Sequence, residues 1–68
     1  MKYPIGTKLI FHNANTKEDY KAEVVAHNDP RLKGKLSFPE DICLYFEEIG
    51  WSNTYDEDII DITCRKAE

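Results

Sequence analysis

The clearest alternation of apolar and polar residues lies in the N-terminal half of the chain. Residues 7–12 are rich in β-branched and aromatic side chains, which predicts a first strand with Leu9 and Phe11 on one face. Residues 20–27 alternate more strictly and predict a second strand, antiparallel to the first and joined to it by the polar loop 13–19. The apolar face of this second strand comprises Tyr20, Ala22, Val24 and Ala26.

The middle of the chain contains turn signals and one ambiguous segment. Asn-Asp-Pro at 28–30, with a glycine at 34, predicts a turn, and residues 35–38 predict a short extended piece that ends at a proline. Residues 37–50 have two interpretations. A capping box followed by apolar residues at helical spacing and a terminal Gly50 would form a helix, whereas the alternation of Ile42, Leu44 and Phe46 favours a core-facing strand.

The C-terminal third continues as short elements. After a turn at 47–50, residues 51–55 predict a strand, and residues 56–58 predict a tight 3₁₀ corner. Residues 59–63 predict the closing strand, with Ile60 and Ile62 on one face. Five or six short strands around one small core indicate an all-β domain spanning residues 1–68, a small and partly open barrel. The competing architecture is a sheet of three or four strands covered by one helix.

Size and composition restrict the function. A chain of 68 residues buries only about 60% of its unfolded surface, so its core is thin and a deep enzyme cleft is not expected. The chain contains no nucleophile elbow, phosphate-binding glycine loop or histidine-rich metal motif, so we expect neither an enzyme nor a cofactor. His12, His27, Cys43 and Cys64 lack the close spacing of zinc ligands, and both cysteines are predicted to be small buried hydrophobic residues.

Charge points to the kind of partner. Acidic residues outnumber basic residues 13 to 9, and the net charge is −4. This balance disfavours nucleic acid as a direct ligand, because affinity for phosphates comes largely from lysine and arginine. A basic protein surface is the expected partner. No apolar run approaches the ~20 residues of a membrane span and the first residues lack the apolar core of a signal peptide, so we expect a soluble, intracellular monomer in cytoplasm or nucleus.

The candidate site lies in residues 46–60. This stretch holds the only tryptophan, two further aromatic residues and five acidic residues. A cation over the face of a tryptophan or tyrosine gains roughly 0.5–2 kcal/mol, and a neighbouring carboxylate adds to the attraction. The combination therefore predicts a site for a positively charged group. The competing interpretation is that these rings only fill the core of a small domain.

Three segments together resemble an SH3-like barrel of the Tudor and chromo-barrel kind. They are the Gly-Thr-Lys-Leu-Ile-Phe-His of residues 6–12, the Tyr-Lys-Ala-Glu-Val-Val of 20–25 and the Gly-Trp-Ser-Asn-Thr-Tyr-Asp-Glu of 50–57. The resemblance implies a five-stranded barrel and the binding of methylated lysine or arginine in an aromatic cage. It implies that the ligand-binding residues are Tyr20, Phe46, Trp51, Tyr55, Asp56 and Glu57, with Tyr45 as a substitute for Phe46.

Two functional hypotheses follow. The first is a non-enzymatic recognition module that binds a basic protein segment, with or without methyl-lysine, through Trp51, Tyr55 and Tyr20. The alternative is a small acidic protein of viral or mobile-element origin that modulates a host nucleic-acid-handling enzyme by occupying its basic surface. In that case the docking face would also include Glu47, Glu48, Asp58 and Asp61.

Overall fold

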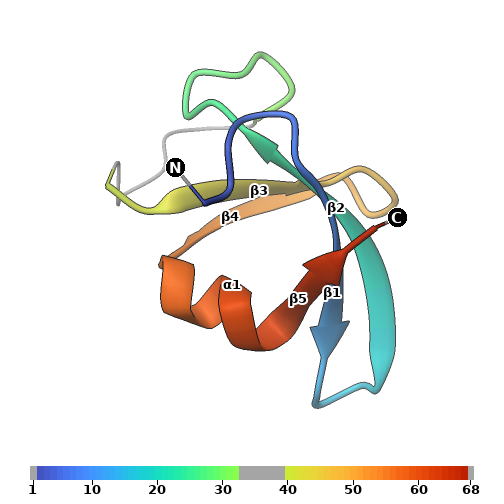
Figure 1. The fold of residues 1–68 in the computed structure, drawn as a ribbon. Coiled ribbons are helices and arrows are strands. Elements are labelled where there is room, and N and C mark those ends of the chain that lie inside the picture. The colour runs from blue at the N-terminus through green and yellow to red at the C-terminus, as the bar shows by residue number, and fades with distance from the viewer. Residues whose placement is uncertain (1, 33–39, 68) are drawn as a thin grey trace.

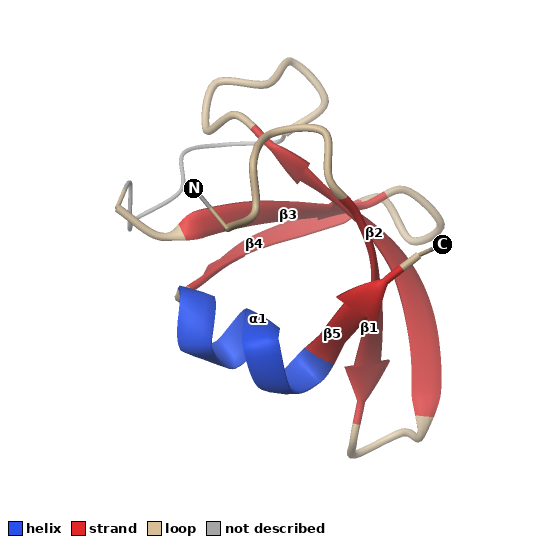
Figure 2. Ribbon diagram, viewed as in Figure 1, coloured by secondary structure: helices blue, strands red, loops and turns tan. Residues whose placement is uncertain are grey.

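The computed structural model describes residues 2–32 and 40–67, which form a five-stranded antiparallel sheet and one short helix (Figure 1). The strands are β1 (Lys8–Asn13), β2 (Glu18–Val25), β3 (Ile42–Phe46), β4 (Trp51–Tyr55) and β5 (Cys64–Lys66), and the helix is α1 (Glu57–Thr63). The strand order is β4-β3-β2-β1-β5, so β4 and β5 are the two edges and the sheet is not closed into a barrel. Helix α1 connects these edges (Figure 2).

The core lies on one face of the sheet, as the alternation predicted. Leu9 of β1 pairs with Ala22 of β2, and Val24 of β2 pairs with Leu44 of β3, so side chains of the same face meet across neighbouring strands. Helix α1 adds Ile60, which is fully buried. The buried cluster comprises Tyr3, Leu9, Ala22, Val24, Leu44, Phe46 and Ile60. The predicted inward faces are therefore confirmed within the strands. However, β2 ends at Val25, so Ala26 lies outside it, and Val25, predicted on the opposite face, is also buried.

Strand boundaries differ from the prediction at the first hairpin. Strand β1 continues to Asn13, and strand β2 already starts at Glu18. The loop between them is therefore shorter than predicted. The side chain of Asn13 accepts hydrogen bonds from the backbone N–H groups of Asn15 and Thr16, and Lys17 adopts a positive φ of 64°. These contacts form a tight turn that leaves the flanking residues free to pair.

The segment from Ile42 to Phe46 is a strand, so the helical interpretation of residues 37–50 is wrong over this part. The predicted extended piece at 35–38 lies outside the described residues. Strand β4 has the predicted bounds, and Gly50 before it has a φ of +62°, a conformation that favours glycine.

The predicted closing strand at 59–63 is wrong, because these residues belong to α1. Asp56 is the N-cap, and its carboxylate accepts a hydrogen bond of 2.9 Å from the Ile59 N–H. Glu57 and Asp58 fill the first turn, where negative charge is favourable. The predicted 3₁₀ corner is therefore the start of an α-helix. Ile60 is buried whereas Ile62 is 80% exposed, so these two side chains do not share a face as predicted.

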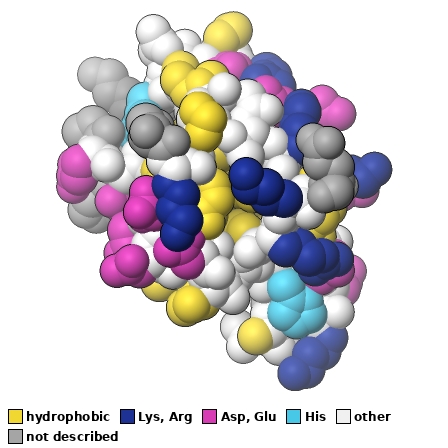
Figure 3. Space-filling model, viewed as in Figure 1, with side chains coloured by type: hydrophobic (Ala, Val, Ile, Leu, Met, Phe, Trp, Pro, Cys, Tyr) yellow, Lys and Arg dark blue, Asp and Glu magenta, His cyan; other side chains and the backbone are white. Residues whose placement is uncertain are grey.

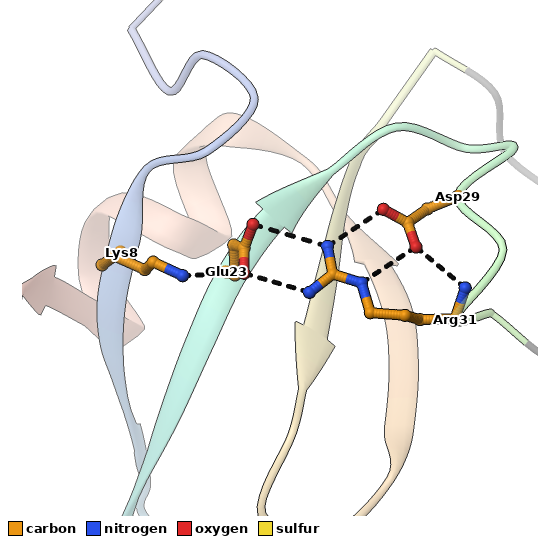
Figure 4. Close-up of polar contacts among 4 residues, drawn as sticks. All are labelled: Lys8, Glu23, Asp29 and Arg31. Atoms are coloured by element: carbon orange, nitrogen blue, oxygen red, sulfur yellow. Dashed lines mark hydrogen bonds and ion pairs between the residues drawn. The ribbon is translucent and has the colours of Figure 1, made fainter.

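Ion pairs cross the face of the sheet opposite the core (Figure 4). Glu23 of β2 accepts hydrogen bonds from Lys8 of β1 at 2.8 Å and from Arg31 at 3.2 Å. Arg31 also binds Asp29 at 2.9 Å and lies over the ring of Tyr45, 5.1 Å from its centroid. The Arg31 guanidinium lowers the pKa of Asp29 to about 2. This network ties the turn after β2 to the sheet.

Candidate functional site

Trp51 opens edge strand β4, and its side chain is 49% exposed. It pairs in register with Phe46 of β3, and the two rings stack with centroids 5.6 Å apart and planes 28° apart. Phe46 is only 2% exposed. The indole therefore packs one side on a rigid aromatic support and presents its remaining surface to solvent, as a binding residue requires.

The predicted ring cage does not assemble around one point. The ring centroid of Phe11 lies 5.4 Å from that of Phe46 and 5.6 Å from that of Tyr55. The rings therefore form a row in the order Trp51, Phe46, Phe11, Tyr55. The four residue steps of β4 between these two ends span about 13 Å. Phe46, one of the predicted ligand-binding rings, is buried within the row and has almost no surface open to a ligand. Tyr20 is half-buried and packs against the core from the position opposite Phe11.

Two of the predicted acidic residues make contacts that stabilise α1. Asp56 caps α1. Asp61 accepts hydrogen bonds from the Tyr3 hydroxyl and from the Lys2 ammonium. Both hydrogen bonds lower the pKa of Asp61, and the bond from Tyr3 has the larger effect. The Tyr3 hydroxyl donates to a carboxylate, so the pKa of Tyr3 is raised. These two acidic residues stabilise the helix and its attachment to the N-terminal segment.

Glu48 has a role in the sheet itself. Strand β3 ends at Phe46, so the N–H of Lys21 on β2 lies beyond the last β2–β3 pair. The Glu48 carboxylate accepts a hydrogen bond of 3.0 Å from this N–H, which replaces the missing ladder bond and fixes the β3–β4 turn against β2. Within residues 2–32 and 40–67, the side chains of Glu47, Glu57 and Asp58 make no hydrogen bond or ion pair.

The assembled candidate site is the β3–β4 turn with the first residue of β4, and we call it the turn site. It comprises Glu47, Glu48, Ile49 and Trp51. Ile49 is 52% exposed and lies two residues before the half-exposed Trp51, so two apolar side chains and two carboxylates belong to one short hairpin. Asp56 and Glu57, predicted as the acidic neighbours of Trp51, lie at the opposite end of β4.

Two features of this region were missed by the sequence analysis. One is the exposure of Ile49, which follows from its place in a four-residue turn. The other is a depression of about 400 Å³ on the face opposite the core, next to the turn. Its lining side chains include Lys8, Ile10, Lys21, Glu23, Tyr45 and Glu47. No local pattern indicates this depression, because three strands and the turn contribute to it.

The cysteines have structural positions. Cys43 is buried, Cys64 is half-buried, and both are free thiols. Burial raises the pKa of each thiol, which disfavours the reactive thiolate at neutral pH. Among the described residues no group of three or more histidine, cysteine or acidic side chains could hold a metal ion. Helix α1, the one helix among the described residues, is too short to cross a membrane.

Comparison of the chain with protein families, characterised proteins and solved structures finds no match.

Proposed function

We propose that the protein is a non-enzymatic recognition module that binds a basic segment of a partner protein at the turn site. The observation that carries this proposal is the half-exposed Trp51 indole, which is stacked on buried Phe46 and follows the acidic β3–β4 turn. The stacking holds the ring in one orientation before the partner arrives, so little conformational entropy is lost on binding.

The chemistry of the turn site suits lysine or arginine. A cation over the indole gains roughly 0.5–2 kcal/mol. The Glu47 carboxylate lies in the same β3–β4 turn and is not engaged by other described side chains, so it adds a longer-range attraction for a cation. Ile49 offers apolar surface for the aliphatic part of the same side chain. The net charge of −4 attracts a basic segment from a distance and makes association salt-dependent.

The row of rings favours an open platform over a closed methyl-lysine cage. Trp51 and Tyr55 lie at opposite ends of β4, and Phe46 between them is buried. The proposed ligand is therefore a lysine or arginine side chain laid along Trp51. An SH3-like barrel stays our proposal for the architecture. It is supported by a five-stranded antiparallel sheet whose two edges are connected by α1.

The alternative of an acidic inhibitor has less support. It requires free carboxylates on one docking face, whereas Glu48 and Asp61 are engaged by the Lys21 N–H and by Tyr3 and Lys2. We therefore do not favour this alternative over recognition at Trp51.

The proposal is tested by calorimetric titration with a lysine–glycine peptide at low salt. Trp51→Ala should abolish measurable binding, while circular dichroism shows an unchanged fold. Glu47→Gln should weaken binding severalfold, and Glu57→Gln, which removes the same charge at the other end of β4, should have little effect. Binding by Trp51→Ala equal to that of the wild type would overturn the proposal. Equal losses in both glutamine variants would show that only net charge matters.

A further inference from the structure

Helix α1 exposes apolar side chains to solvent. Ile60 is fully buried, but Ile62 is 80% exposed and Ile59 is 39% exposed. Ile59 and Ile62 are three residues apart, and Asp58 and Ile62 are four apart, so these three side chains are neighbours on one helix surface. We call Asp58, Ile59 and Ile62 the α1 ridge. Figure 3 shows acidic side chains gathered on the side of the molecule where α1 lies, with hydrophobic side chains beside them.

Stability of the helix does not explain an isoleucine at position 62. The solvent face of a short helix normally carries polar residues. Isoleucine has a lower helix propensity than alanine, lysine or glutamate, because its branched side chain loses rotamer freedom against the preceding turn. The side chain of Ile62 also packs little against the core, since Ile60 is the only buried residue of α1. Ile62 therefore gains little within the monomer.

The charged residues of helix α1 are all acidic. Helix α1 carries Glu57, Asp58 and Asp61 and no lysine or arginine. Lys2 neutralises Asp61 at 2.9 Å. Asp58, beside Ile62, makes no ion pair within the described part of the chain. The α1 ridge thus combines aliphatic surface with uncompensated negative charge.

We infer that the α1 ridge is a second docking surface, for a protein partner that presents lysine or arginine side chains around an aliphatic patch. A second copy of this chain is a poor occupant, because packing α1 against another α1 would bring carboxylates together. Nucleic acid and anionic membranes are repelled by the same carboxylates. The inference goes beyond the turn site and does not depend on it, since Trp51 and α1 lie at opposite ends of β4.

Two probe peptides of equal charge separate the apolar contact from electrostatic attraction. One alternates lysine with leucine and the other alternates lysine with serine, and the affinity of each is measured for the wild type and for Ile62→Ser. Isoleucine and serine have similar helix propensities, so this substitution leaves α1 intact. The wild type should prefer the leucine peptide by roughly fivefold, the effect of burying part of one aliphatic side chain.

Ile62→Ser should lose this preference. Ile5→Ser is the matched control, because Ile5 is 65% exposed outside α1 and its replacement should leave the preference unchanged. The inference is overturned if the wild type shows no preference or if Ile62→Ser retains it. It is also overturned if sedimentation shows self-association that Ile62→Ser abolishes. Trp51→Ala should keep the preference, whereas its loss there would assign the contact to the turn site and contradict a second surface.

Discussion

Replacing Ile60 with alanine should destabilise the protein far more than the same replacement at Ile62. Both residues are isoleucines of α1, but Ile60 is fully buried in the core and Ile62 is 80% exposed. Since the gain in helix propensity is about the same at both positions, the difference between the two variants reports burial alone.

The expected loss at Ile60 can be worked out from its burial. Isoleucine to alanine removes three methyl-sized groups at ~0.8 kcal/mol each, about 2.4 kcal/mol, and the cavity left behind adds to this within a range of ~2–5 kcal/mol. A domain of 68 residues is stable by about 3–10 kcal/mol, so Ile60→Ala removes a large part of the total. Ile62→Ala should stay within about 0.5 kcal/mol of the wild type.

Urea denaturation gives the free energy of unfolding of both variants, and thermal unfolding gives their melting temperatures, each followed by circular dichroism. Ile60→Ala should lower the melting temperature by at least about 10 °C, whereas Ile62→Ala should leave it nearly unchanged. The same pair distinguishes the helix from the closing strand that the sequence predicted. In a strand, Ile60 and Ile62 would share a face, and the two variants would lose similar stability. Equal losses would refute the assignment of α1.

Three further predictions concern polar contacts. The Asp29 carboxyl should titrate with a pKa of about 2 by NMR, and Arg31→Ala should return this pKa toward 3.8. The contribution of Asp29 to the free energy of unfolding is present above pH 3.8 and is lost as the pH falls toward 2. Asp56→Ala should cost about 0.5–2 kcal/mol in urea denaturation, whereas Asp56→Asn should keep the cap; equal losses would contradict the cap. Glu48→Ala should accelerate amide hydrogen exchange at Lys21. Glu48→Gln should not, because its side-chain amide oxygen still accepts the hydrogen bond from the Lys21 N–H. Unchanged exchange in Glu48→Ala would exclude this hydrogen bond.

The sheet could be predicted because half-buried strands alternate. The pattern of Ile42, Leu44 and Phe46 placed β3 correctly, and the turn at Gly50 fixed the start of β4. The closing segment failed for a physical reason. Residues 59–62 read Ile-Ile-Asp-Ile, a run too short to separate helical from alternating periodicity, and isoleucine favours strands. The N-cap at Asp56, followed by two acidic residues, was the signal that favoured a helix.

The candidate site was predictable only in part. The sequence placed an exposed ring and acidic residues in one stretch, and Trp51 is indeed half-exposed. It could not show which of two facing rings lies inside, because Phe46 and Trp51 are paired across β3 and β4. It also could not show that Asp61 binds Tyr3, since this contact joins segments 58 residues apart. Such roles depend on how the sheet and helix pack.

The central claim is that the exposed indole of Trp51 receives a basic side chain, and acrylamide quenching tests it most directly. Trp51 is the only tryptophan, so its fluorescence reports the turn site alone. Without ligand, a half-exposed indole should be quenched efficiently. A saturating lysine–glycine peptide should reduce this quenching, and salt should restore it. Unchanged quenching at peptide concentrations that saturate binding by calorimetry would contradict the claim.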